Sequence, residues 1–545
     1  MYEGTNTQLF MRYAVPQLVG LLFNSVYFIV DGVFIGHRLG TDAMAAAAVS
    51  VPLAEMLTAL SIAIASGAGA QISRHIARGQ KKHARQIFNI AMAVSAAAGA
   101  LVTISGWLFM DPLAVLLGST PEIHGQAIEY MKYIILFSPF MLWNFLLGGL
   151  ARNDGCPRLA MSALTLGSLS NILLDYVFMY PLNMGVSGAA LATALGPIFS
   201  IVLLLPHFLL KKGFLYFAPF RLRLRNVLEI LVSGFPSFIM EFTIGMDTFI
   251  YNFAIAKYGY GGLGLAAYLI IGYLMLIILT LFLGMAEGLQ PVFSYFAGLD
   301  DLKRCREMRR CALNIFFAAG IACTLLTALF SDRFYALFNP GDIELIEFAH
   351  EKSLYYFSAF SLAGCNILMI SYWQSTGSTG RALILSLSRS IVWLPVLTAV
   401  LPGFFGRGII WGCHSLAETL TACTALILLK REKRQSCPPH AAAQKKTAFH
   451  GNTAFVKGSF SVQTETLCRV DVHHHVLDLC KLLLHTVMHV FGNAVGLAQR
   501  EAAVDADFYV YVNPVSEFPG IQQINAHHAG LSHHAAAQRR NCFVI

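Results

Sequence analysis

A small set of polar side chains interrupts long apolar runs in the amino-acid sequence. Asp31 lies in NSVYFIVDGVFIGHRLG, and Asn171 and Asp175 lie in SNILLDYVF. The i, i+4 spacing of Asn171 and Asp175 places both side chains on one face of a helix. Asn144 and Thr193, in neighbouring runs, supply further oxygen atoms. Because buried carboxyls take up protons and hard cations prefer oxygen ligands, these five residues are candidates for binding H⁺ or Na⁺.

The composition explains why such residues are conspicuous. Of the 545 residues, 56% are hydrophobic and 12% are charged, against about 25% charged in an ordinary soluble domain. An acidic residue at the centre of a membrane span costs about 2.5–3.5 kcal/mol, so it is a functional candidate by default. The alternative is that these carboxyls only stabilise helix packing. The composition argues against a soluble enzyme and predicts an integral membrane protein.

A membrane-spanning helix needs about 20 apolar residues. Twelve stretches qualify and predict an all-α membrane protein, namely 14–36, 43–72, 87–110, 126–150, 159–180, 186–210, 227–256, 263–296, 311–331, 346–373, 382–402 and 408–429. Lys and Arg concentrate after the even-numbered spans, in residues 74–85, 211–225, 303–310 and 430–434. Since basic loops stay in the cytoplasm, we expect both ends of the twelve-helix body to be cytoplasmic. The net charge of +8 then reflects membrane topology, and no nucleic-acid partner is needed to explain it.

The sequence repeats itself at a spacing of about 220 residues. The repeated positions are Gly40, Gly69, Gln71, Gly79 and Arg85, which match Gly259, Gly288, Gln290, Gly298 and Arg304. We therefore predict two six-helix lobes, an N-lobe over residues 1–215 and a C-lobe over residues 216–435. Repeats of this kind are typical of secondary transporters, which handle substrate between two halves.

The C-lobe offers candidates for binding a cationic substrate. Glu241, in the seventh span, is the best candidate, while Asp247 and Glu287 of the same lobe and Glu55 of the N-lobe are weaker candidates. Aromatic rings attract cations through their faces, so an aromatic wall is predicted from Tyr251, Tyr268, Tyr372 and Trp373. Ordinary interfacial aromatic residues are the alternative. Arg389 is interpreted as a structural partner for one of the acids.

Several signatures are missing from the sequence. The chain has no G-x-x-x-x-G-K-[ST] loop, no H-E-x-x-H motif and no convincing nucleophile elbow. We therefore expect no enzymatic activity, no metal site and no cofactor beyond H⁺ or Na⁺ as a coupling ion. Transport driven by an ion gradient is favoured over a passive channel, because nothing repeats as a filter ring.

Longer motifs carry a resemblance to a known family. They are P-x₁₄-D-G-x-F-I-G-x-x-L-G, SGAGAQISRHIARGQ, ARNDGCPRLA, SNILLDYVF and MGVSGAALATALG, followed by GFPSFIMEF, GMAEGLQPVFSYFAG and LSLSRSIVWLPV. Over residues 8–430 the chain resembles MATE (multidrug and toxic compound extrusion) transporters, and within them the bacterial MepA-like branch.

The resemblance implies export of organic cations or drugs against inward H⁺ or Na⁺ by alternating access, from a monomer in the cell membrane. It implies that Asp31 is the coupling acid, with Asn171, Asp175 and Thr193 in its network, and that Glu241 matches an acidic position of the second lobe. Small lipophilic cations and membrane lipid are the implied partners. Glu55 and His414 depart from the family pattern. A flippase for lipid-linked precursors is the alternative, and it predicts a basic cavity.

The last 110 residues do not fit the transporter pattern. Residues 436–545 hold 11 of the 18 histidines, including His473, His474 and His475. Three adjacent histidines do not readily face one ion, so we do not predict a metal site there. Residues 476–498 are interpreted as an interfacial helix or as no stable helix, and the whole tail as disordered or unrelated to the family.

Overall fold

The computed structural model describes residues 2–337 and 342–435, and within these ranges the secondary structure is helical, without strands. Ten helices are long and apolar enough to cross a membrane. Two bent helix pairs bring the number to twelve when each pair counts as one span. The predicted all-α membrane fold is thereby confirmed. The tail that begins at residue 436 lies outside the described residues.

The first half of the body comprises eight helices, of which α5 and α6 together form one bent span. Their bounds are α1 (Asn6–Leu39), α2 (Thr41–Ala77), α3 (Lys81–Leu108), α4 (Met110–Leu116), α5 (His124–Leu136), α6 (Ser138–Asn153), α7 (Pro157–Met179) and α8 (Val186–Leu209). The predicted boundary between the lobes falls in the connection between α8 and the next helix.

The second half follows the same plan. Its elements are α9 (Leu224–Lys257), α10 (Gly261–Gly298), α11 (Leu302–Tyr335), α12 (Ile343–Phe357), α13 (Phe360–Ser375), α14 (Thr379–Leu387), the π-helix η1 (Ser388–Trp393), α15 (Leu394–Phe405), the 3₁₀ turn η2 (Arg407–Ile409) and α16 (Ile410–Gln435). Helix α12 and helix α13 form one bent span, and α14, η1 and α15 form another span.

The internal repeat is visible in the backbone. The bent pair α5–α6 turns by 49°, and its counterpart α12–α13 turns by 48°. Gly40 joins the first two spans of one half with φ of 85°, and its repeat partner Gly259 joins the first two spans of the other half with φ of 75°. Both values lie in the region that glycine adopts readily. The repeated glycines therefore mark equivalent turns.

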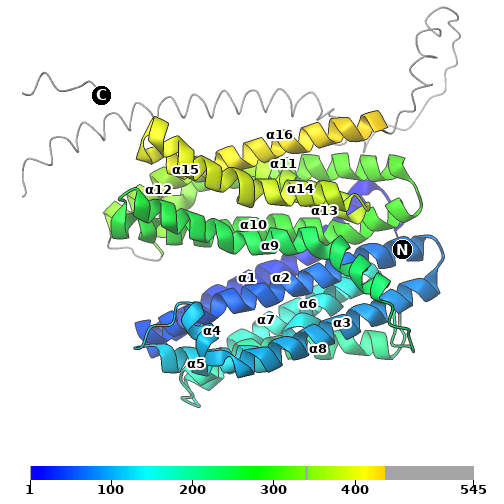
Figure 1. Ribbon diagram of the computed structural model, residues 1–545, viewed down its shortest axis with the longest axis horizontal. Helices are drawn as coiled ribbons and strands as arrows, with labels where there is room; N and C mark the ends of the chain where they lie inside the picture. The colour runs from blue at the N-terminus through cyan, green and yellow to red at the C-terminus, as the bar shows by residue number, and fades with distance from the viewer. Residues whose placement is uncertain (1, 338–341, 436–545) are drawn as a thin grey trace, which may run out of the picture. The chain divides into compact units, whose positions relative to one another are not determined.

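The first helix of each half packs against the second helix of the other half, α1 against α10 and α9 against α2 (Figure 1). These helices approach so closely that side chains do not fit between them. A Cβ atom on Gly288 would lie 2.5 Å from the backbone oxygen of Tyr13, and one on Gly234 would lie 2.0 Å from the backbone oxygen of Ala63. Small residues at membrane helix contacts permit this spacing.

The basic loops identified in the sequence all lie at one end of the helices. The α2–α3 turn, the α8–α9 connection, the α10–α11 turn and the C-terminal end of α16 share the end at which α1 begins (Figure 1). We call this the basic end.

Candidate functional site

A cavity of about 350 Å³ lies between the two halves. Its walls come from six helices of the first half and from α9 and α10 of the second. The residues that line it include four carboxyls and no lysine, arginine or histidine. The four are Asp31, Glu55, Glu241 and Glu287. A cavity with this lining suits a positively charged ligand.

The predicted ion-binding residues of the first half meet at this cavity. Asp31 on α1 and Asp175 on α7 are close neighbours, and both are buried. With its amide nitrogen turned toward Asp175, Asn171 donates a hydrogen bond to Asp175 Oδ2 at 3.1 Å, and its oxygen accepts one from Thr193 N at 3.2 Å. The hydroxyls of Thr193 and Tyr130 lie 3.4 Å apart. The structure thus brings together residues from four helices that are distant in sequence.

Several buried oxygen atoms of this cluster have no hydrogen-bond partner. They are Asp31 Oδ1, Asp175 Oδ1 and Asn144 Oδ1. A buried polar atom without a partner costs free energy, so each of these oxygens has unused capacity to accept a hydrogen bond. Asp31, Asn144, Asn171 and Thr193 line the cavity itself, and Asp175 is held behind them by Asn171.

Toward the basic end the cavity terminates at a polar bridge between the halves. Glu287 on α10 accepts a hydrogen bond from Gln17 Nε2 on α1 at 2.8 Å and pairs with Arg152 Nη2 on α6 at 3.4 Å. Arg152 Nη1 also donates to Gln17 Oε1 at 2.7 Å. The sequence did not identify Gln17 or Arg152, because nothing along the chain links residues 135 or more positions apart.

The predicted substrate residues of the second half are separated in the structure. Glu241 lines the cavity. Tyr251 and Tyr268 stack on each other at 4.9 Å inside the core of the second half. Tyr372 and Trp373 lie elsewhere on α13, where Tyr372 faces the guanidinium of Arg309 at 4.7 Å. The residues that line the cavity include other aromatics instead, namely Tyr27, Phe28, Tyr130, Phe145 and Tyr273.

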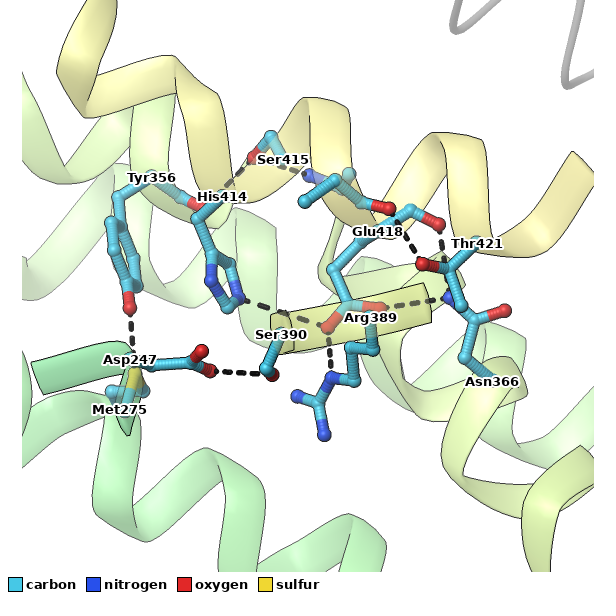
Figure 2. A network of polar contacts seen from close by, with 12 residues as sticks. Asp247, Met275, Tyr356, Asn366, Arg389, Ser390, His414, Ser415, Glu418 and Thr421 are labelled. Carbon is cyan, nitrogen blue, oxygen red and sulfur yellow. Dashed lines mark hydrogen bonds and ion pairs between the residues drawn. The ribbon is translucent and has the colours of Figure 1, made fainter. Parts of the chain in front are cut away.

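A second charged cluster lies within the second half, away from the cavity lining (Figure 2). Arg389, on the π-helix η1, pairs with Glu418 of α16. Glu418 also accepts a hydrogen bond from Asn366 Nδ2 at 2.8 Å, and His414 Nε2 lies 3.8 Å from the same carboxyl. Arg389 is therefore a structural partner of an acid, as predicted. That acid is Glu418, which was not among the acids considered in the sequence analysis. The i, i+4 spacing of His414 and Glu418 in the last span is the sequence feature that could have indicated this cluster.

Asp247 and His414 complete this cluster. Ser390 donates a hydrogen bond to Asp247 Oδ2 at 3.1 Å, while Asp247 Oδ1 has no partner. The ring of His414 stacks on Tyr356 (Figure 2), with 4.6 Å between the ring centroids. The backbone N–H of His414 donates to the hydroxyl of Tyr251 at 2.8 Å. A proline at this position would lack that N–H.

Comparison with known proteins agrees with this architecture. The MatE family model matches residues 16–177 and again residues 236–398, so its two matches begin 220 residues apart, as the internal repeat requires. The multidrug export protein MepA of Staphylococcus saprophyticus is 26% identical over 424 residues, covering 77% of this chain and 92% of MepA.

Two solved structures have the same fold. An outward-facing multidrug resistance MATE family transporter of the MOP superfamily superimposes with a TM-score of 0.75 at 22% identity, covering 79% of this chain and 96% of the other. A MOP superfamily transporter from Pyrococcus furiosus gives 0.74 at 22% identity, covering 79% and 96%. With the family model matched in both halves, this chain belongs to the MatE family.

Proposed function

We propose that this protein is a secondary active transporter that exports organic cations in exchange for H⁺ or Na⁺ by alternating access. The name of its staphylococcal relative, a multidrug export protein, supports drug-like substrates. The bent spans and the seam between two repeated halves provide a body whose halves can rock around a central site.

The charge of the cavity is the observation that carries this proposal. Four carboxyls and no basic side chain line it, so it attracts cations and repels anions. Glu241 and Glu287 reach it from the second half, and Asp31 and Glu55 from the first. A flippase for anionic lipid-linked precursors would require the opposite sign of charge. The lining therefore favours export of lipophilic cations.

The coupling site is assigned to the first half. Asp31 and Asp175 form a buried pair of acids, and among the described residues no basic side chain bonds or pairs with either of them. Two neighbouring carboxylates in a low-dielectric site do not both stay charged, so the pair takes up a proton or a metal cation. Because Asp31 and Thr193 line the cavity, the bound ion and the substrate compete for the same space and the same negative charge.

The basic end is assigned to the cytoplasm. Basic loops are retained on that side of a bacterial membrane, and every basic loop of the body lies at this end. The Gln17–Glu287–Arg152 bridge then lies on the cytoplasmic side of the cavity. Breaking it is part of opening the cavity to the cell interior.

A flux assay on proteoliposomes tests the proposal. Wild-type protein is expected to move a fluorescent organic cation when an H⁺ or a Na⁺ gradient is imposed, and the effective gradient identifies the coupling ion. Asp31→Asn is expected to lose gradient-driven flux, because it removes the acid of the pair that lines the cavity and can take up the coupling ion there. Asp247→Asn is the matched control, since Asp247 is a buried acid that does not line the cavity.

Three results would contradict the assignment. Flux that is independent of any ion gradient would contradict coupling. Unchanged coupling in Asp31→Asn would contradict the site. Preferential transport of anionic lipid headgroups would favour the flippase alternative.

A further inference from the structure

The residues that precede α1 lie across the seam between the two halves. Tyr2 is only 3% exposed, and its hydroxyl donates to the backbone oxygen of Asn153, at the end of α6, at 3.4 Å. Its ring stacks on Tyr13 of α1 at 5.2 Å and lies 4.3 Å from the ring of Tyr295 of α10. Tyr2 therefore contacts helices of both halves at the basic end.

A second contact holds the same segment against the second half. Arg304, at the start of α11, donates a hydrogen bond from Nη2 to the backbone oxygen of Gly4 at 2.7 Å. Thr5 and Gln8 form a reciprocal capping box at the start of α1, with bonds of 3.3 and 3.0 Å. Because this cap fixes the segment to α1, the bond from Arg304 ties α11 to the first half.

The internal repeat supplies an equivalent arrangement on the other side. The connection that precedes α9 places Tyr216 beneath the guanidinium of Arg85, at the start of α3, with 3.6 Å between Cζ and the ring centroid. Asn89 of α3 donates to the backbone oxygen of Tyr216 at 3.2 Å. Arg85 and Arg304 are partners in the sequence repeat. In both cases, an arginine at the start of the third span of one half holds the segment that precedes the first span of the other half.

The two segments differ in what they must do. The connection before α9 joins the halves covalently, so its contacts are also needed to guide the chain from α8 to α9. Residues 2–5 do not join the two halves. Their buried aromatic ring and their backbone bond reach α6, α10 and α11, none of which is adjacent to them in sequence. Local packing of a helix start does not account for these contacts.

We propose that residues 2–5 form an N-terminal clasp that holds the two halves together at the basic end and favours the state in which the cavity is closed there. This inference rests on the alternating-access function proposed above. When α10 and α11 move away from α1 and α6, the clasp loses the Tyr2–Tyr295 and Gly4–Arg304 contacts. The clasp thus sets how readily the transporter opens toward the side assigned to the cytoplasm.

Distances between spin labels test the clasp on the full chain in lipid nanodiscs. Labels carried by noncanonical amino acids at Lys82 and Lys303, both exposed at the starts of α3 and α11, report the separation of the halves at the basic end. A second pair at Leu116 and Leu337, which are 80% and 78% exposed, reports the opposite end. Neither substrate nor coupling ion is needed, so the outcome is independent of whether the transport assay succeeds.

Tyr2→Ala and Arg304→Gln are expected to raise the population with a long Lys82–Lys303 distance by about fivefold, at the low end of couplings between two conformations. The opposite pair should become shorter at the same time. Tyr2→Phe keeps the ring contacts and should stay near wild type. Arg306→Gln is the matched control, because Arg306 lies on the same turn of α11, is exposed, and within the described part of the chain bonds to the backbone oxygen of Leu302 on its own helix.

Two results would overturn the clasp. Wild-type distance distributions in both Tyr2→Ala and Arg304→Gln would mean that the contacts do not bias the conformation. Longer or broader distances at both ends of the molecule would mean that the variants only loosen the packing of the body.

Discussion

Replacing Gly234 with alanine is expected to push the transporter out of the state closed at the basic end. Gly234 on α9 and Gly67 on α2 face each other across the seam, each ten residues from the basic end of its helix. A Cβ on Gly234 would lie 2.0 Å from the backbone oxygen of Ala63, and one on Gly67 would lie 2.1 Å from that of Ile230. Because these obstacles are backbone atoms, no side-chain rotation relieves the clash.

The size of the effect follows from this geometry. Ordinary van der Waals contact begins at 3.4 Å, so the helices must separate by about 1.4 Å to accept the methyl group. Overpacking of this kind costs about 1–3 kcal/mol. If only the closed state holds α2 and α9 this close, its population relative to the open state falls about 5- to 150-fold. The gain in helix propensity of about 1 kcal/mol from Gly to Ala applies to both states and cancels.

The Lys82–Lys303 label pair measures this shift, and Gly245→Ala provides the control. Gly245 lies on the same helix, but a Cβ at this position meets nothing within 4 Å. Gly234→Ala should gain a long-distance population that Gly245→Ala lacks, and gradient-driven efflux should slow in the former alone. Identical distance distributions in the two variants would refute the reasoning, because the seam would then not be the surface that opens.

Three further outcomes are expected. Glu418→Gln should lower the midpoint of thermal unfolding markedly, because leaving the buried Arg389 unpaired costs about 3–5 kcal/mol of folding free energy. Replacing both Arg389 and Glu418 with methionine should recover most of this loss. A Glu418→Gln variant as stable as wild type would contradict the prediction. Glu55→Gln removes one carboxyl from the cavity wall and should weaken transport of divalent organic cations more than that of monovalent ones, as measured by competition in the flux assay. Removing residues 436–545, which lie outside both matched segments, should leave gradient-driven efflux intact, and loss of both expression and efflux would contradict the interpretation of this tail.

Much of the first-half site was predictable from the sequence because its members are rare where they occur. A carboxyl inside an apolar run is costly enough to attract notice, as with Asp31. The i, i+4 spacing of Asn171 and Asp175 fixes their common helical face without any tertiary information. The structure adds the proximity of Asp31 and Asp175, which depends on the packing of α1 against α7.

The second half resisted the same reasoning because its candidate residues lie on three different helices, α9, α10 and α13. Sequence spacing then gives the angle between two side chains but not which of them points to the cavity. Asp247 follows Glu241 by six residues, about 240° around the helix, so the two project on different faces. The structure places Glu241 on the cavity and places Asp247 and Tyr251 among other helices of the second half. An aromatic wall next to Glu241 required all of these residues to share one face.

The repeat itself also limits what could be inferred by analogy between the halves. The first-half acids lie on α1 and α7 with Thr193 of α8, and the equivalent elements of the second half, α9, η1 and α16, carry Asp247, Arg389 and Glu418. The position of the cluster is retained, but its charge balance differs. Arg389 neutralises one acid of the second-half cluster from within, whereas Asp31 and Asp175 have no basic partner in the part of the chain that the structure describes. This difference in charge balance is why we propose that coupling occurs in the first half despite the near-symmetry of the fold.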